Sequence, residues 1–562
     1  MKQVLMFIIA FLTIWQGELH AIDDFRERVY VQTDKQLYLA GELLWMKLCL
    51  TDESGQPASF SKVAYVELLD RSGAVAQAKV DMKNGVGEGW LELPALLPTG
   101  YYSLVAYTRY MRNEGNDVFF RKNIGVVNTF KANESIPADS FCMFDDAKAD
   151  AVNNTVRLSL DKSTFSKREK GHISLRDLPA DIHTLALSVA GSEFVPVPGQ
   201  SSIDEWKASL ANISNHPLAD DFIPEYEGHI ISGRVISADG DSSGVLSGFQ
   251  SLLGFVGDNM RVYGGQSRPD GSMLFYTNRI DGMKELATTT YSSTGARYRV
   301  DVEYPFVIHP SQDLPKFRLN PLWREKLTAR HVALQATRVF MADSFGHVAT
   351  TMPHLLPVPY KSYLMDEWTR FPTMSQSVFE FVESVSFRNR DDGKHSLFVL
   401  LSDLSNQTVS LNYPLVLLDG IPVIDHEQLY DYNPALIKRL DVYRNRYAFG
   451  GQVFEGILAF YTKKGDYEGL KLDGFTQLFD YEGTQLRRIF YSPSYDDASS
   501  KSSRMPDYRH TLLWIPFVET DGAVELDIPF YTSDLSGEYT VNLEGLTRDG
   551  KPLKAVARFK VE

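Results

Sequence analysis

The stretch that most constrains the fold of this chain is residues 414–465, PLVLLDGIPVIDHEQLYDYNPALIKRLDVYRNRYAFGGQVFEGILAFYTKKG. It opens with the short apolar run 415–418, which ends at Asp419 and Gly420. An apolar run of this length, closed by a turn dipeptide, indicates a buried strand. Asp-Gly is itself a favoured turn pair, so a turn explains Asp419 better than a catalytic carboxylate does.

The second half of this stretch predicts a short helix and two more strands. Asn433 fits a helix N-cap, and Pro434 fits the first helical position. Apolar strand patterns follow at 440–443 and 454–462, separated by a glycine pair at 450–451. The whole stretch therefore predicts a small α/β unit in the order strand, helix, strand, strand.

These elements resemble, in the same order, the plug domain of TonB-dependent outer-membrane receptors. The resemblance rests on the segments LVLLDGIPV, NPALIKRLDVYR, YAFGG and EGILAFYTKKG. In the receptors, the plug lies inside a barrel formed by the same chain. A barrel of that width needs about 22 strands of about ten residues each, and only about 100 residues follow Lys464.

The resemblance therefore implies a plug-like domain at 360–470 without a barrel of its own. It implies docking on an outer-membrane barrel supplied by another chain. The motif residues are the candidates for that docking: Asp419, Gly420, Pro422, Asn433, Pro434, Tyr447, Gly450, Gly451 and Gly456.

An amphipathic segment introduces the plug-like stretch. Thr373 and Gln376 fit a capping box. Apolar residues follow on one helical face, which predicts a helix packed on the core: Met374, Val378, Phe381, Val382 and Val385.

The N-terminus predicts export. Lys2 precedes an apolar run at 4–15, and a polar segment then ends at Ala21, so residues 1–21 resemble a secretory signal peptide. We expect a protein of the periplasm or the outer-membrane surface, with no transmembrane span after signal removal. The formal net charge of −15 argues against nucleic acid as a partner.

The chain contains two cysteines, Cys49 and Cys142. An exported protein can pair them in a disulfide, but two cysteines in so long a chain are not a disulfide framework. Two buried thiols are the favoured interpretation, and the pairing stays open.

Four further segments predict β-sandwiches, and the expected fold is mainly β. At 43–50, apolar residues alternate with others in the pattern of a half-buried strand. The motif DKQLYLAGE keeps Asp34, Lys35, Tyr38, Gly41 and Glu42, and it resembles the second macroglobulin-type domain of the α2-macroglobulin family. The expected fold is thus a string of macroglobulin-like or immunoglobulin-like sandwiches with the small α+β plug-like domain inserted.

The predicted boundaries cover the whole chain. After the signal peptide come a macroglobulin-type sandwich at 22–128, a second one at 129–200, a linker at 201–227, a sandwich resembling a carboxypeptidase regulatory-like module at 228–328, a connector at 329–359, the plug-like domain at 360–470 and a C-terminal macroglobulin-like sandwich at 471–562. A carboxypeptidase regulatory-like module ahead of a plug resembles receptors of Bacteroidota, and the combination of a plug-like domain with macroglobulin-type domains resembles envelope proteins of Bacteroidota.

Motifs that resemble reactive sites are better explained as structure. His426-Glu427 lacks the second histidine of a zinc-protease helix, and Ser344 lacks the glycines of a nucleophile elbow. The sequence ADGDSSG at 238–244 lacks the distant glutamate of a calcium loop, and the glycines at 85, 87 and 89 precede no helix. We therefore predict no catalytic residue, no metal site and no cofactor.

The leading functional hypothesis is a non-enzymatic, exported accessory protein that docks on or gates an outer-membrane barrel. One alternative is a macroglobulin-like protease-binding protein, whose cleavable segment would be the polar loop at 492–510. Another alternative is a surface adhesin or glycan-binding protein, which would need exposed aromatic side chains.

Overall fold

The structure is a computed structural model. It describes residues 25–130, 154–192, 197–199, 202–213, 217–237, 247–291, 298–307, 314–317, 323–341, 356–402 and 412–562. The predicted signal peptide at 1–21, Cys142, Ser344 and the whole ADGDSSG segment at 238–244 lie outside these ranges. Within them, no helix is both long and apolar enough to cross a membrane.

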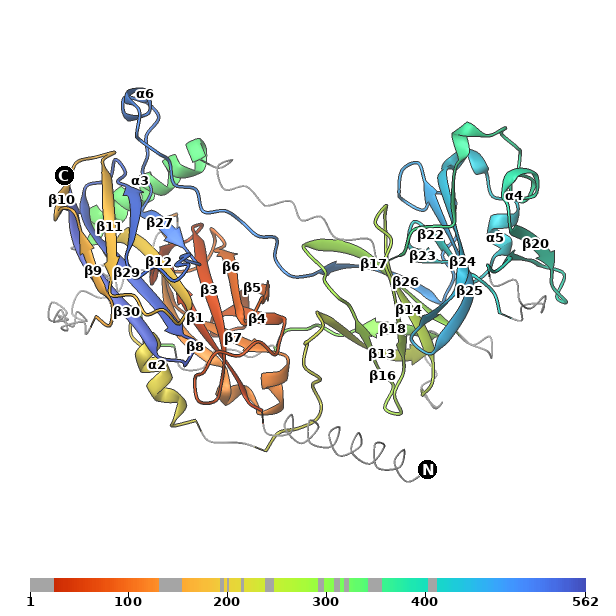
Figure 1. The fold of residues 1–562 in the computed structure, drawn as a ribbon, viewed down its shortest axis with the longest axis horizontal. Coiled ribbons are helices and arrows are strands. Elements are labelled where there is room, and N and C mark those ends of the chain that lie inside the picture. The colour runs from red at the N-terminus through yellow and green to blue at the C-terminus, as the bar shows by residue number, and fades with distance from the viewer. Residues whose placement is uncertain are drawn as a thin grey trace. The chain divides into compact units, whose positions relative to one another are not determined.

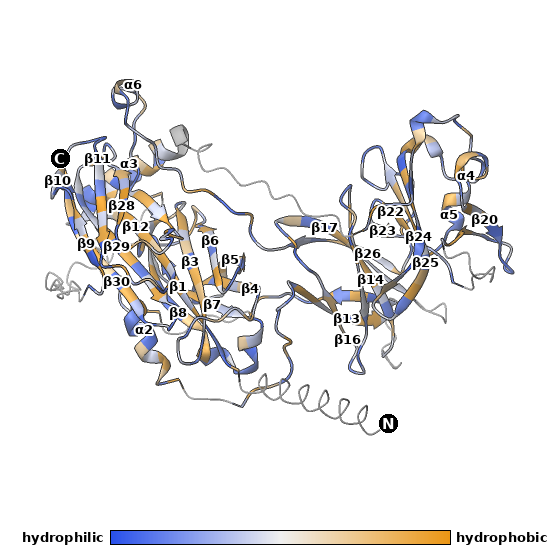
Figure 2. Cartoon of the chain, viewed as in Figure 1, coloured by the Kyte–Doolittle hydropathy of each residue, from blue (hydrophilic) through white to orange (hydrophobic). Residues whose placement is uncertain are grey.

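The chain is mainly β and divides into two units (Figure 1). Unit 1 comprises residues 1–226, 307–349 and 484–562, and unit 2 comprises 227–306 and 350–483. Each unit is thus built from separate stretches of the chain. In both units, apolar residues concentrate on the strands, as the colouring of Figure 2 shows.

The first sandwich of unit 1 corresponds to the segment predicted at 22–128. Its smaller sheet has the order β1 (Glu27–Thr33), β3 (Leu43–Asp52), β6 (Val86–Glu92). Its larger sheet has the order β2 (Leu37–Leu39), β8 (Phe120–Val127), β7 (Gly100–Thr108), β4 (Val63–Leu69), β5 (Ala74–Asp81). Every pairing in these two sheets is antiparallel except that of β2 with β8.

Strand β3 is buried on both faces, although its alternating pattern predicts one exposed face. Leu44 and Leu48 lie in the sandwich core, but Lys47 on the other face is only 4% exposed. The second sandwich covers this outer face, as the hydrogen bond from the Tyr30 hydroxyl to the Glu544 carboxylate (2.7 Å) shows. The outer face of β3 is buried because the second sandwich packs on it, and the alternation of residues along the strand does not indicate such a neighbour.

The second sandwich of unit 1 corrects the predicted domain boundaries. Its five-stranded sheet has the order β10 (Thr164–Phe165), β30 (Pro552–Val561), β29 (Gly537–Thr547), β12 (Ile182–Gly191), β27 (Thr511–Ile515). Its other sheet has the order β28 (Leu526–Tyr531), β11 (Lys170–Arg176), β9 (Arg157–Leu160). The segments predicted as separate sandwiches at 129–200 and 471–562 therefore share one fold, because β12 pairs with β27 on one side and with β29 on the other.

Two helices of unit 1 lie where the sequence predicts a linker and a connector. Helix α2 (Ile203–Leu210) begins with a capping box between Ser202 and Glu205. Its Trp206 ring lies 5.0 Å from the Tyr30 ring, so the segment predicted as a linker packs on the first sandwich. Helix α3 (Arg324–Met341) crosses the predicted boundary between 328 and 329.

Unit 2 contains a sandwich with strands from two distant stretches. One sheet has the order β16 (Ser272–Tyr276), β13 (Ile230–Ser237), β18 (Tyr298–Val302). The other has the order β15 (Val262–Gln266), β14 (Gln250–Phe255), β17 (Met283–Tyr291), β26 (Thr476–Glu482). The predicted boundary at 471 is therefore wrong, because β26 belongs to this sandwich and not to the C-terminal one.

The rest of unit 2 is a mixed sheet with short helices. The sheet has the order β19 (Lys361–Leu364), β24 (Ile437–Phe449), β25 (Gln452–Thr462), β22 (Leu415–Leu418), β23 (Ile421–Pro422). A hairpin of β20 (Val385–Asn389) and β21 (His395–Val399) accompanies it, with α4 (Met374–Phe381), α5 (Glu427–Tyr430) and the 3-10 turn η7 (Pro434–Leu436). The predicted order of strand, helix, strand and strand over 415–462 is observed.

The helix predicted from 374 to 385 is shorter than its apolar pattern. Thr373 caps it by accepting a hydrogen bond from the Gln376 amide (3.4 Å), but the helix ends at Phe381. Val382 and Val385 nevertheless join Met374 and Val378 in one core cluster. The apolar positions were therefore predicted correctly as core, although only part of them is helical.

Candidate functional site

The Asp419-Gly420 turn of the plug-like motif connects the ends of two strands of the mixed sheet through side-chain hydrogen bonds. Asp419 is fully buried and has a φ of +47°. Its carboxylate accepts hydrogen bonds from the Thr462 amide (2.8 Å), the Thr462 hydroxyl and the Tyr467 amide (2.8 Å). The side chain thus ties the end of β22 to the end of β25, which explains why an acidic residue occupies a buried turn.

Glycines of this motif and of the sandwich of unit 2 allow the backbones of the mixed sheet and the sandwich to pack closely together. A Cβ atom at Gly420 would lie 1.9 Å from the carbonyl oxygen of Phe255, and one at Gly264 would lie 2.1 Å from the amide nitrogen of Gly450. The Gly451 amide donates to the Gln250 side-chain oxygen (3.1 Å). These contacts require backbones without side chains between them.

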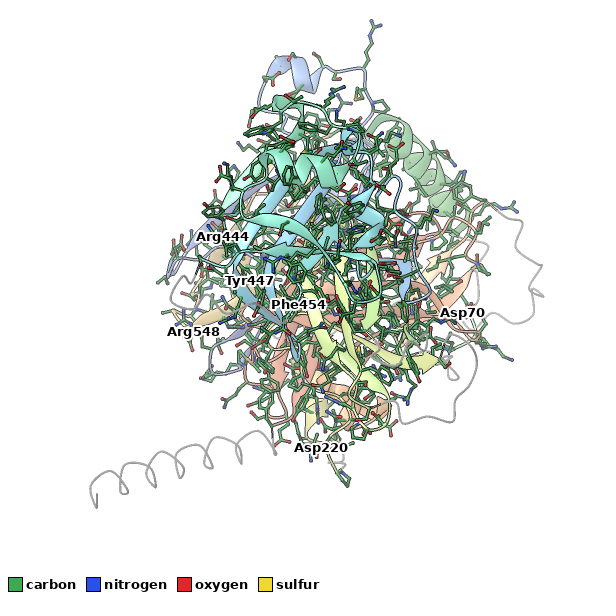
Figure 3. The ribbon with its side chains drawn as sticks, turned by 90° about the vertical axis from the view of Figure 1, so that its right-hand side faces the viewer. Asp70, Asp220, Arg444, Tyr447, Phe454 and Arg548 are labelled. Atoms are coloured by element: carbon green, nitrogen blue, oxygen red, sulfur yellow. The ribbon has the colours of Figure 1, made fainter. Side chains whose placement is uncertain are left out.

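The other motif residues also have structural roles within unit 2. Asn433 caps η7 by accepting from the Ala435 amide (3.0 Å), and Pro434 is the first residue of that turn. Pro422 lies on β23, opposite Leu417, and Gly456 has a φ of +97° where β24 and β25 shift register. Tyr447 is half-buried and lies opposite Phe454, as labelled in Figure 3. The predicted motif residues thus make contacts within unit 2 that stabilise its fold. Their docking on a partner stays a proposal.

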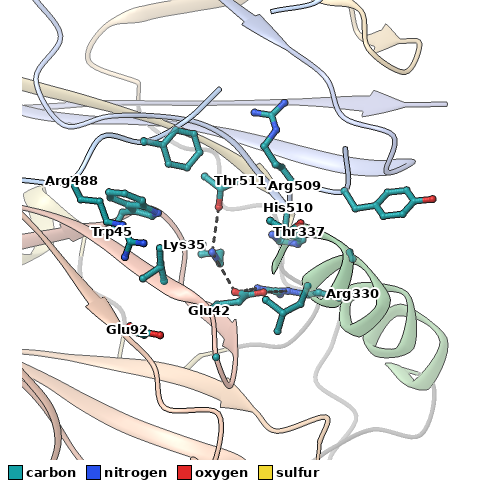
Figure 4. A pocket seen from close by; sticks show the side chains of 16 residues that line it. Lys35, Glu42, Trp45, Glu92, Arg330, Thr337, Arg488, Arg509, His510 and Thr511 are labelled. Atoms are coloured by element: carbon teal, nitrogen blue, oxygen red, sulfur yellow. Dashed lines mark hydrogen bonds and ion pairs between the residues drawn. The ribbon is translucent and has the colours of Figure 1, made fainter. Parts of the chain in front are cut away.

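The macroglobulin-type motif of the first sandwich forms a charged network in unit 1 (Figure 4). The Asp34 carboxylate accepts from the Tyr38 hydroxyl (2.7 Å), the Trp45 amide (3.1 Å) and the Thr511 hydroxyl (2.9 Å). Lys35 Nζ lies 3.1 Å from Asp34 and 3.4 Å from Glu42. Because Thr511 belongs to β27, the motif joins the two sandwiches.

Helix α3 adds a second cation to this network. Arg330 Nη2 donates to the Leu37 carbonyl oxygen (2.6 Å) and lies 3.2 Å from the Glu42 carboxylate. Burial by itself raises the pKa of Glu42, but the Arg330 and Lys35 cations outweigh it and lower this pKa to about 2. Glu42 therefore carries its charge at neutral pH and holds α3 against the first sandwich.

A cavity of about 270 Å³ opens beside this network. Its walls combine apolar and charged side chains from the first sandwich, α3 and the segment that precedes β27: Lys35, Glu42, Leu43, Trp45, Glu92, Arg330, Ala333, Leu334, Thr337, Arg488, Phe490, Tyr508, Arg509, His510 and Thr511, with Gly41. Figure 4 shows these side chains around the hollow.

His510 is the one imidazole on this wall. Burial lowers its pKa well below the ordinary value, the Arg330 cation lowers it further, and the ring is therefore neutral. Its Nδ1 atom has no hydrogen-bond partner among the described residues.

Sequence reasoning identified Asp34, Lys35, Tyr38, Gly41 and Glu42 but missed the residues that complete the cavity. Arg330 lies 288 residues after Glu42, and Thr511 lies 477 residues after Asp34. No local pattern marks a residue as the partner of another at that distance. Only the packing of α3 and β27 on the first sandwich brings these groups together.

We expect the Glu42→Gln substitution to lower the free energy of unfolding of unit 1 by about 2 kcal/mol at pH 7, because two buried cations lose their shared carboxylate. The pKa of Glu42 is below its ordinary 4.5, so its stabilisation is present above pH 4.5 and is lost as the pH falls towards 2. Urea unfolding of both proteins at pH 7 and pH 3 measures this. An equal difference at both pH values would contradict the assignment.

The motifs that resemble reactive sites have structural explanations where the structure describes them. His426 is buried, which lowers its pKa to about 4, and its Nδ1 atom accepts from the Leu397 amide (3.2 Å). Gly85 has a φ of +79° and lies against the Ala58 carbonyl, in the turn before β6. Cys49 is a free, buried thiol, and burial raises its pKa to about 11.

Comparison with known proteins supports the predicted resemblance to the second macroglobulin-type domain. The MG2 domain family matches residues 28–121. This range covers the first sandwich from β1 to the start of β8. Residues 28–121 form an MG2 domain of the α2-macroglobulin type. No curated protein matches the chain.

Solved structures of bacterial α2-macroglobulins are also similar to this chain, at low identity. The native α2-macroglobulin of Escherichia coli is 12% identical over 96% of this chain, with a TM-score of 0.24. The same protein activated by porcine elastase is 10% identical over 95% of this chain, with a TM-score of 0.23. Salmonella α2-macroglobulin reacted with methylamine has the same identity, coverage of this chain and TM-score. The chain spans 40%, 44% and 39% of the lengths of these three proteins.

Proposed function

We propose that this protein is a non-enzymatic, exported envelope protein whose plug-like mixed sheet docks on or gates an outer-membrane β-barrel supplied by another chain. The support is the sequence resemblance of residues 360–470 to receptor plugs, together with the mixed sheet and short helices formed there. The N-terminal segment that resembles a signal peptide supports export to the periplasm or the outer-membrane surface. The MG2 domain and the other sandwiches would then act as spacers and contact surfaces.

The observation that carries the proposal is an exposed aromatic surface on the plug-like part. Phe379, on α4, is 86% exposed, and Trp368 is 39% exposed. The Trp368 ring stacks on the Phe381 ring at 4.8 Å. Contiguous apolar patches that are left in solvent mark interaction sites.

The test is recovery of a partner from solubilised outer membrane with the full chain as bait. We expect a large barrel protein to be recovered with the native chain and to be lost with Phe379→Ser. Tyr276→Ser is the matched control, because Tyr276 is 43% exposed on β16 of the neighbouring sandwich. Recovery of soluble proteins alone, or equal recovery with Phe379→Ser, would contradict the proposal.

A protease-binding function is the second candidate, because the MG2 domain is of the α2-macroglobulin type. Its cleavable segment would be 492–510, which contains the single-turn helix α6 (Ala498–Lys501). Arg168 holds this segment by donating to the carbonyl oxygens of Ser503 (2.7 Å) and Met505 (2.6 Å) and by binding Asp534 (2.7 Å). If this function holds, incubation with an endoprotease should change the apparent size of this protein and reduce the activity of the protease. Unchanged protease activity would exclude this function.

We expect Arg168→Ala to make the 492–510 segment a protease target. The substitution removes the donors to the carbonyl oxygens of Ser500, Lys501, Ser503 and Met505 and an ion pair. Cleavage by trypsin after Lys501 or Arg504 should therefore accelerate by about tenfold or more. Mass spectrometry of a digestion time course identifies the cut. Lys167→Ala, next to Arg168 in the chain, is the control and should leave the cleavage rate unchanged.

A further inference from the structure

A second cavity, of about 560 Å³, lies between the two sandwiches of unit 1. Strands β1 and β8 of the first sandwich contribute to it, as do β12, β29 and β30 of the second sandwich and the start of α2. Most of its lining residues have polar side chains, among them Gln32, Thr33, Lys122, Ser192, Thr540 and Glu544.

Lys122 brings a buried charge to this cavity. It is 7% exposed, and its ammonium group donates to the Thr33 hydroxyl (3.1 Å). It forms no ion pair with any residue that the structure describes. An ammonium group has three donors and is costly to bury without a counter-charge.

A second buried lysine at the same interface, Lys47 on β3, does not line the cavity. It is 4% exposed, and its ammonium group makes neither a hydrogen bond nor an ion pair within the described ranges. The Glu544 carboxylate acts electrostatically on both lysines but accepts its hydrogen bond from the Tyr30 hydroxyl (2.7 Å). Neither ammonium group forms an ion pair with Glu544 within the described ranges, and Asp34 also acts electrostatically on Lys122.

The charged side chains that line the cavity balance in number: Lys35, Lys122, Lys554 and Arg558 against Asp34, Glu205, Glu538 and Glu544. Lys35 lies 3.1 Å from Asp34 in the motif network. Lys122, by contrast, is a buried cation of this lining that has no ion pair within the described ranges.

Gln32 adds an unused polar group beside this charge. The residue is 2% exposed, and its amide nitrogen has no acceptor among the described residues. Hydroxyl groups also line the cavity, including the Ser192 and Thr540 pair, whose oxygens lie 2.7 Å apart. Water can satisfy such hydrogen-bonding groups, but water carries no charge to balance an ammonium.

We propose that this cavity binds a small carboxylate-bearing polar molecule, with the Lys122 ammonium as its counter-charge and the Gln32 amide as a further donor. The bound carboxylate would give the Lys122 ammonium an ion pair, and the hydroxyl and amide side chains of the lining would contact the rest of the molecule. A sugar acid and the C-terminus of a short peptide both present this carboxylate chemistry. The site lies in unit 1 and is independent of the docking proposed for unit 2.

The test is isothermal titration calorimetry of the full chain with three probes: glucuronate, N-acetylglycine and uncharged glucose. We expect at least one carboxylate probe to bind and glucose to bind more weakly or not at all. Tighter binding of glucuronate assigns the site to sugar acids, and tighter binding of N-acetylglycine assigns it to peptide termini. Absence of binding by both carboxylates, or equal binding of glucose, would overturn the proposal.

Variants separate a binding role from a structural one. Lys122→Met should weaken carboxylate binding about tenfold or more, while the thermal midpoint stays unchanged or rises, because a buried ammonium is replaced by an apolar chain. Gln32→Leu should weaken binding less and serves as a second variant. Lys560→Met, on the exposed part of β30, is the matched control. Unchanged binding in Lys122→Met would overturn the assignment.

Discussion

Asp419→Ala is expected to lower the free energy of local unfolding of the mixed sheet in unit 2 by about 3–4 kcal/mol. The substitution removes one buried carboxylate that accepts from two backbone amides, of Thr462 and Tyr467, and from the Thr462 hydroxyl. Each buried donor left without an acceptor costs about 1–3 kcal/mol. The positive φ of Asp419 adds strain that an alanine relieves less well than an aspartate.

Native-state hydrogen exchange measures this effect in the intact chain, because it reports the opening of β22 and β25 separately from the other sandwiches. Amides of Leu417 and Leu458 should lose most of their protection, whereas those of β29 in unit 1 should keep theirs. Asp391→Ala, in the exposed turn between β20 and β21, is the control and should change protection by less than about 0.5 kcal/mol. A similar loss in both variants would show that Asp419 does not lock the turn.

Arg509→Met is expected to destabilise unit 1 by about 3–5 kcal/mol, because it leaves a buried carboxylate without its cation. Arg509 and Asp507 are almost fully buried and form two parallel contacts of 2.8 Å each. Arg509 also donates to the Leu512 carbonyl oxygen (2.8 Å), which holds the 492–510 segment to the start of β27. Urea unfolding followed by circular dichroism gives the change in the free energy of unfolding.

The double variant Arg509→Met with Asp507→Leu distinguishes loss of the ion pair from loss of packing. If the unpaired charge causes the destabilisation, the double variant should be more stable than Arg509→Met alone. Asp507 also accepts from the Tyr495 hydroxyl (2.8 Å), so full recovery is not expected. A double variant less stable than the sum of both single changes would contradict this account.

Local patterns in the sequence predicted much of the plug-like part correctly. The apolar run at 415–418, the Asp419-Gly420 turn and the Asn433-Pro434 cap each depend on residues within a few positions of one another. The same holds for the MG2 motif, whose Asp34, Tyr38 and Glu42 lie within nine residues. Both were recognisable because backbone conformation and short-range hydrogen bonds act over such distances.

The glycines of the plug-like motif, which were predicted to dock on a partner, show which contacts a local sequence pattern cannot predict. Gly420 and Gly450 were chosen for a resemblance, and the structure gives them contacts with Phe255 and Gly264 of the neighbouring sandwich. A glycine in a sequence indicates close approach of a backbone, but it does not indicate which backbone approaches.

The sequence by itself determined the mainly β class, the MG2 domain and the order of elements in 415–462. Only the tertiary structure decided that residues 154–191 and 511–562 share one sandwich, and that β26 completes the sandwich of unit 2. It also placed Arg330 against Glu42 and buried Lys47 and Lys122 between the sandwiches. The physical reason is that strand periodicity records which face of a strand is apolar, whereas its pairing partner depends on hydrogen bonds between segments that can be hundreds of residues apart.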